Sequence, residues 1–72
     1  MARRNLVGRN FARLRRDRGL IQEQIKEISD FGQQYISGVE RGRRNPTVIT
    51  LDKLSQALGV SPVELVQSDA EN

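Results

Sequence analysis

Apolar residues recur every three or four positions along most of this chain, and glycine or proline interrupts the pattern at short intervals. Such spacing is typical of amphipathic α-helices that bury one face. It predicts five short helices with these apolar arcs in turn: Val7, Phe11 and Leu14; Ile21, Ile25 and Ile28; Tyr35, Ile36 and Val39; Leu51, Leu54 and Leu58; Leu65 and Val66. No stretch alternates with a period of two, so we predict an all-α fold without strands.

Residues that commonly begin or end helices stand between these arcs. Gly19, Gly42 and Gly59 each follow an apolar arc, where a left-handed C-terminal residue is common. Thr47 is a predicted N-cap. Residues 61–64, Ser-Pro-Val-Glu, have the pattern of a capping box with proline at the first helical position.

The helices account for one domain. We predict it over residues 6–67, with a flexible basic N-terminal arm at 1–5 and a polar C-terminal tail at 68–72. Seventy-two residues lie near the lower limit at which one apolar core maintains a fold. This length leaves no room for an effector domain, so we expect no small-molecule effector.

The chain contains no cysteine and no histidine, which excludes disulfides and ordinary zinc sites. No carboxylates cluster with acid–base spacing, so we expect no enzyme activity, no metal and no cofactor. The N-terminus lacks the apolar core of a signal peptide, and no apolar run approaches the roughly 20 residues of a membrane helix. We therefore expect a cytoplasmic protein without membrane association.

Positive charge is concentrated in the first part of the chain. Up to residue 44 there are eleven Arg and Lys against five Asp and Glu, whereas the remainder has one Lys against four acidic residues. Ten of the twelve cationic residues are Arg, which binds phosphate through two parallel hydrogen bonds. A one-sided positive field favours a polyanion, although charge alone leaves open a merely soluble basic surface.

The predicted helix over residues 33–41 has two different faces. Its outer face carries Gln33, Gln34, Ser37 and Arg41. An α-helix fits the major groove of DNA, where a Gln amide bonds to N6 and N7 of adenine. Tyr35 lies at the rim, where it suits either the edge of the core or a contact to DNA. We predict DNA base contacts by Gln33, Gln34, Ser37 and Tyr35, although paired Gln is also ordinary solvent-exposed filler.

A basic loop follows this helix, because Pro46 prevents its continuation. Arg43, Arg44 and Asn45 in this loop are predicted phosphate contacts, together with Arg41.

The first helix carries a second group of arginines. Arg9, Arg13 and Arg16 gather opposite its apolar arc. They are weaker candidates for phosphate contacts, since a charged outer face is usually only solvated.

From about residue 7 to 66 the chain resembles the helix-turn-helix domains of the phage repressor and Cro class, the XRE-type regulators. The resemblance is carried by Val7, Gly8, Phe11, Leu14, Arg15, Leu20, Gln22, Glu23, Ile25, Phe31, Ile36, Ser37, Val39, Glu40, Gly42, Asn45, Pro46, Leu51, Leu54, residues 57–60 and Leu65. The run 35–42, Tyr-Ile-Ser-Gly-Val-Glu-Arg-Gly, followed by Arg-Arg-Asn-Pro, is most similar to small stand-alone members, including controller proteins of restriction–modification systems.

The resemblance implies a compact five-helix lambda-repressor-like domain, with helices two and three as the helix-turn-helix. It implies base contacts at the positions of Gln33 and Gln34 and a phosphate contact by Gln22 near the start of helix two. It also implies an ion pair between Arg15 and Glu40, which we interpret as a structural strut for helix three.

Three residues depart from the family pattern. Ile21 stands where Ser or Thr usually caps helix two, Lys26 replaces a small residue, and Asp30 replaces the glycine of the turn. Each is expected to cost roughly 0.5–2 kcal/mol, unless the Lys26 stem packs while its ammonium stays in water.

The resulting functional prediction is a sequence-specific regulator of transcription that binds double-stranded DNA. One helix reads few base pairs, so we expect a homodimer on a roughly palindromic operator. Its predicted dimer surface comprises Val60, Val63, Leu65 and Val66, unless these complete the monomer core. The alternative function is a protein-interaction module of the same fold, antitoxin-like or adaptor.

Overall fold

The computed structural model describes residues 2–68, and the side chains of residues 6–68. It contains five α-helices and no strands in that range: α1 (Ala2–Asp17), α2 (Gln22–Ser29), α3 (Gln33–Glu40), α4 (Val48–Leu58) and α5 (Pro62–Val66). The all-α, five-helix fold predicted from the sequence is confirmed.

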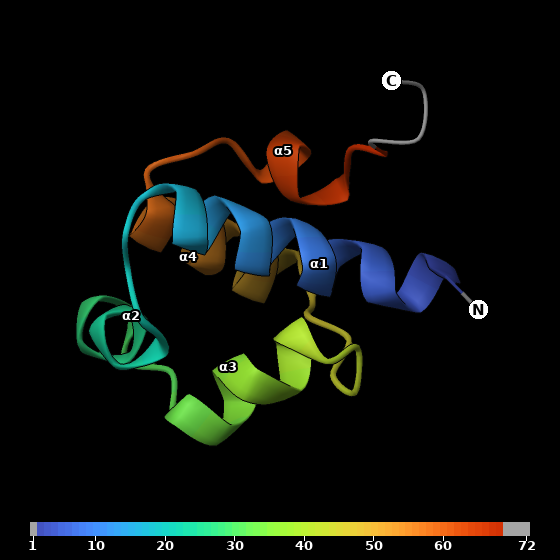
Figure 1. The fold of residues 1–72 in the computed structure, drawn as a ribbon. Coiled ribbons are helices and arrows are strands. Elements are labelled where there is room, and N and C mark those ends of the chain that lie inside the picture. The colour runs from blue at the N-terminus through green and yellow to red at the C-terminus, as the bar shows by residue number, and fades with distance from the viewer. Residues whose placement is uncertain (1, 69–72) are drawn as a thin grey trace.

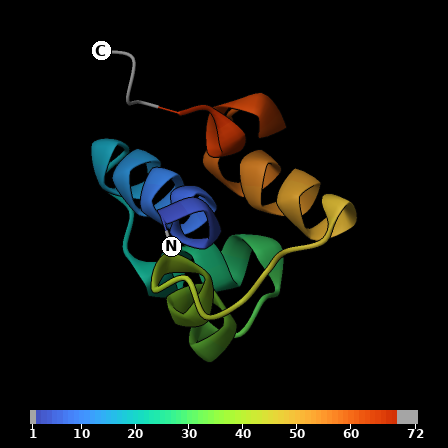
Figure 2. The same cartoon turned by 90° about the vertical axis from the view of Figure 1, so that its right-hand side faces the viewer.

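The helices form a closed ring around one core. α1 packs on α3, α3 on α2, α2 on α4, α4 on α5, and α5 again on α1. α3 therefore lies at one end of the molecule and α5 at the other, with α1 and α4 between them (Figure 1 and Figure 2).

Each helix contributes at least one fully buried large apolar side chain to the core. These are Phe11, Ile25, Ile36, Leu54 and Leu65. Burying an aliphatic or aromatic side chain of this size stabilises a fold by about 1.5–3 kcal/mol. The core thus depends on all five helices, including the short α5.

The predicted N-termini of α4 and α5 are confirmed. The Thr47 hydroxyl oxygen accepts a hydrogen bond from the Thr50 N–H at 3.2 Å. At α5, the Ser61 hydroxyl accepts from the Val63 N–H at 3.3 Å, and Glu64 Oε2 accepts from the Ser61 N–H at 3.2 Å. These bonds satisfy N–H groups that have no partner within the helix.

The first helix begins earlier than expected. α1 starts at Ala2, so the backbone of residues 2–5 is helical where we predicted a flexible arm. Ala and Arg have favourable helix propensities, which allows the helix to continue toward the N-terminus. Residues 69–72 of the predicted tail lie outside the described residues.

Two contacts hold α3 and α5 against α1. Gly8 is buried against α3, and a Cβ at Gly8 would overlap the carbonyl oxygen of Val39. On the α5 side, the buried Asn10 amide donates to the carbonyl oxygens of Leu65 at 2.9 Å and Gln67 at 2.8 Å. α1 therefore sets the positions of both α3 and α5.

No helix among the described residues is both long enough and apolar enough to cross a membrane.

Candidate nucleic-acid interface

A three-residue turn, 30–32, joins α2 to α3. Asp30 adopts a left-handed conformation with φ 68°, and its N–H donates to the Lys26 carbonyl at 2.8 Å. The Ser29 hydroxyl donates to the Ile25 carbonyl at 2.7 Å and accepts from the Phe31 N–H at 3.2 Å. Hydrogen bonds thus hold the turn in the conformation that the usual glycine would adopt without strain.

The other two departures have smaller consequences. Ile21 has no side-chain acceptor, but Gln24 Oε1 accepts from the Ile21 N–H at 2.8 Å, so half of a capping box remains. Lys26 is exposed on α2. Its ammonium can therefore stay in water, as the exception stated for this position requires.

The two faces of α3 are arranged as its sequence predicts. Ile36 and Val39 are buried and hold the helix against the core. The outer face carries Gln33, Gln34 and Arg41, which are exposed, and Ser37, which is half-buried. Because a buried inner face fixes the helix, its outer side chains are presented at defined positions.

A polar network ties α1, α2 and α3 together at one edge of this face. Arg15 donates through Nε to Glu40 Oε2 at 2.7 Å and through Nη2 to Oε1 at 3.1 Å, so the pair implied by the resemblance is formed. Gln22 Nε2 donates to the same Oε1 at 3.0 Å, and Arg15 Nη1 donates to the Leu20 carbonyl at 2.8 Å. Gln22 is thus held by Glu40 and keeps a second amide hydrogen for another acceptor.

An aromatic stack occupies the opposite edge. The rings of Phe31 and Tyr35 lie 5.2 Å apart, and the Arg44 guanidinium lies 5.6 Å from the centre of the Tyr35 ring. A Cβ at Gly38 would lie 2.8 Å from Arg44 Cγ. Gly38 therefore leaves room for the arginine stem, and a cation–π contact at an exposed site is worth about 0.5–1 kcal/mol.

An open hollow of about 470 Å³ brings several predicted DNA contacts together. It is lined by Gln34, Ser37, Gly38, Arg41, Arg43 and Arg44. Three guanidinium groups beside an amide and a hydroxyl suit phosphate oxygens and base edges. Gln22, Gln33 and Asn45 do not line this hollow.

The predicted dimer surface needs correction. Leu65 is fully buried and Val60 is half-buried against the core, so Leu65 is not available to a partner. Val63 and Val66 are exposed and line an apolar groove between α4 and α5. The groove also contains Val48 and Ile49, which sequence reasoning missed, because their position before the apolar arc of α4 gave no sign of their neighbours.

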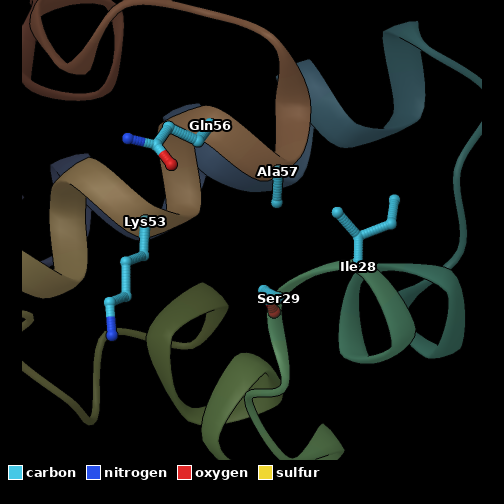
Figure 3. Close-up of a pocket in the computed structure, with 5 residues that line it drawn as sticks. All are labelled: Ile28, Ser29, Lys53, Gln56 and Ala57. Atoms are coloured by element: carbon cyan, nitrogen blue, oxygen red, sulfur yellow. The ribbon is translucent and has the colours of Figure 1, made fainter.

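A further hollow lies between α2 and α4 (Figure 3). It is lined by Ile28, Ser29, Lys53, Gln56 and Ala57. The Lys53 ammonium and the Gln56 amide point apart, and the Ser29 hydroxyl already donates to Ile25. These polar groups do not converge on a common ligand.

Two helices joined by a tight turn, with exposed amides on the second and an arginine-rich loop after it, define a helix-turn-helix DNA-binding domain. A family model described as helix-turn-helix matches residues 11–65. The chain therefore belongs to the XRE-type helix-turn-helix family and is a transcriptional regulator.

Known proteins resemble it over most of its length. It is 68% identical over 66 residues to an uncharacterized HTH-type transcriptional regulator of Sinorhizobium fredii, a match covering 92% of this chain and 86% of that protein. The restriction–modification controller protein C.AhdI from Aeromonas hydrophila has a similar structure, with a TM-score of 0.85 and 37% identity over 90% of this chain and 98% of that one. The controller C.Esp1396I, solved as a tetramer with its natural 35 base-pair operator, matches with a TM-score of 0.78 and 29% identity over 89% of this chain and 95% of that one.

Proposed function

We propose that this regulator binds double-stranded DNA sequence-specifically, as a homodimer on a roughly palindromic operator, with α3 in the major groove. The exposure of Gln33 and Gln34 on the first turn of α3 carries this proposal. The N-terminal residues of the second helix are those that reach base edges in this motif. A Gln amide placed there pairs with adenine in a way that no other base reproduces.

Gln33, Gln34 and Ser37 are the proposed base contacts. Tyr35, predicted among them, is half-buried and stacked beside Arg44, so we assign it to holding that arginine.

The proposed phosphate contacts come from both edges of α3. Gln22 supplies one through its remaining amide hydrogen, at the N-terminus of α2 where the helix dipole favours an anion. Arg41, Arg43, Arg44 and Asn45 supply the others, and all four are exposed. Contacts of this kind position a protein on the duplex without specifying sequence.

A second copy of this chain is the proposed occupant of the α4–α5 groove. Val48, Ile49, Val63 and Val66 expose 82%, 69%, 56% and 46% of their surface. Contiguous apolar surface of this kind is characteristic of interaction sites. α5 lies at the opposite end of the molecule from α3, with α4 between them (Figure 2). Pairing through the groove of α4 and α5 would therefore leave α3 of each copy free for DNA. Its relative C.Esp1396I forms a tetramer on DNA, which supports self-association.

Electrophoretic mobility shift with genomic fragments tests the function. We expect only a few of the fragments to form a discrete complex. The affinity should fall steeply as the salt concentration rises, because phosphates release counterions when the protein binds them. A DNA affinity that depends neither on salt concentration nor on fragment sequence would instead favour a protein-interaction module. Since the proposed ligand is operator DNA and the relatives named above are bacterial, we place the protein in the cytoplasm.

A pair of substitutions separates base contacts from phosphate contacts. We expect Gln33→Ala to relax base preference at one operator position, costing about 1–3 kcal/mol there, because alanine cannot form the two hydrogen bonds of the amide. Arg43→Ala should weaken binding to all sequences similarly and reduce the salt slope by about 1. Binding to an operator library randomised one position at a time measures both effects, and the reverse pattern would overturn the assignment.

A further inference from the structure

The exposed arginines on the outer face of α1 gather around one hollow. Arg9, Arg13 and Arg16 line an open hollow of about 420 Å³ together with Ala12 and Glu40. The hollow therefore spans α1 and the end of α3, the helix that we propose reads DNA. Three arginines of one helix thus line it.

No carboxylate neutralises this group. Within residues 6–68 none of the three arginines forms an ion pair, and Arg13 has one side-chain contact, to Asn10 Oδ1 at 3.5 Å. The carboxylate of Glu40 already accepts hydrogen bonds from Arg15 and Gln22 at both oxygens. Like charges three and four residues apart repel each other on a helix, so an anion in the hollow would relieve a repulsion present in the free protein.

With α3 in the major groove, as proposed above, the hollow would lie beside one strand of the DNA. Around the axis of α3, Glu40 and Tyr35 border the outer face on opposite sides. A helix in the major groove has one sugar–phosphate strand along each side. Gln22 donates to Glu40, so with α3 in the groove it would face the strand on the Glu40 side. Further phosphates of that strand would then pass near the hollow, which contains Glu40 in its wall.

We propose that Arg9, Arg13 and Arg16 bind phosphates of the strand that Gln22 contacts, extending the protein–DNA contact along α1. The proposal rests on the DNA binding proposed above. The ligand is the phosphodiester backbone of duplex DNA, so these residues add affinity and salt dependence without base preference.

A matched pair of double variants tests this inference. Arg9→Gln/Arg16→Gln removes two charges from the hollow and keeps the contact of Arg13 with Asn10. Arg18→Gln/Lys53→Gln removes the same net charge from exposed residues that do not line it. Affinity for the selected operator is measured from low to moderate salt, together with melting temperature and ethylation interference along each strand.

We expect Arg9→Gln/Arg16→Gln to lower the salt slope by about 0.9 for each phosphate that is no longer neutralised, and by twice that amount in a dimer. Base preference should stay unchanged, and the melting temperature should stay the same or rise slightly, because the two substitutions remove like-charge repulsion along α1. Fewer phosphates near Gln22 should interfere with binding when ethylated. An effect equal to that of Arg18→Gln/Lys53→Gln, with wild-type specificity intact, would overturn this inference alone. A wild-type protein without any sequence-specific complex would overturn the proposed function and this inference together.

Discussion

Asp30 is a single residue that adopts a conformation suited to glycine. Its φ of 68° is the one positive value found among non-glycine residues of the described chain. Its carboxylate makes no hydrogen bond within that part of the structure and lies at the C-terminal end of α2, where negative charge is unfavourable. The backbone turn, rather than the side chain, therefore carries the structural role at this position.

We expect Asp30→Gly to stabilise the protein. Relief of the left-handed strain, roughly 1–2 kcal/mol, exceeds the added backbone entropy of glycine, roughly 0.5–1 kcal/mol. The net gain of about 0.5–1 kcal/mol should raise the melting temperature by a few degrees. Asp30→Ala is the control, because it removes the charge and keeps the strain. A lower melting temperature for Asp30→Gly than for the wild type would contradict this account.

Gly38 and Arg44 show how a residue gains its role from a contact outside its own helix. A mid-helix glycine costs up to about 1 kcal/mol relative to alanine. Here the missing side chain leaves space for the Arg44 stem, and Tyr35 supports its guanidinium. The Arg44 side chain is therefore already ordered before it contacts the proposed phosphate, which reduces the entropy cost of binding.

At the scale of elements, the approach of α1 to α3 decides how α3 is presented. Gly8 allows a contact between the two helices that any side chain would prevent. The Arg15–Glu40 pair then links the same two helices beyond that contact, and both side chains are nearly buried, at 12% and 9% exposed. The position of the outer face of α3 thus depends on a close packing contact and on a charged pair.

We expect Gly8→Ala to destabilise the protein by about 1–3 kcal/mol, because the added methyl group forces α1 and α3 apart. DNA affinity should also fall, and by more than the loss of folded protein alone would cause, because α3 moves relative to Gln22. Gly32→Ser is the control: a Cβ at Gly32 meets no atom within 4 Å, φ is −65°, and serine is favoured at this N-cap position of α3. Chemical denaturation and DNA titration measure the two effects, and equal stability of the two variants would contradict the packing argument.

At the scale of the whole molecule, the ring of helices separates two surfaces. α3 lies at one end and α5 at the other, and the loop after α3 leads to the start of α4 (Figure 1 and Figure 2). The apolar groove is formed by α4 and α5. Asn10 links the groove to the rest of the domain, because its amide holds the end of α5 on α1. A dimer formed through the groove would therefore present two α3 helices at a fixed separation, as a palindromic operator requires.

We expect Ile49→Glu to abolish dimerisation while the monomer stays folded. Ile49 is 69% exposed, so the substitution leaves the core intact and should change monomer stability by at most about 0.5 kcal/mol. A carboxylate buried without a partner in the dimer interface is strongly unfavourable. Ile28→Glu is the control, because Ile28 is also exposed but lies outside the groove. Sedimentation equilibrium measures the outcome, and a dimer that persists in Ile49→Glu would place the interface elsewhere.

The sequence by itself determined the five helices, their caps at Thr47 and Ser61, the two faces of α3 and the unusual turn at Asp30. These features depend on neighbours within a few residues, and helical periodicity reports them directly. Only the tertiary structure decided that Leu65 is buried, that Arg44 lies over Gly38, and that the α1 arginines line a hollow with Glu40. Periodicity places a side chain around the axis of its own helix, whereas the partner that it meets depends on how closely and at what angle separate helices pack.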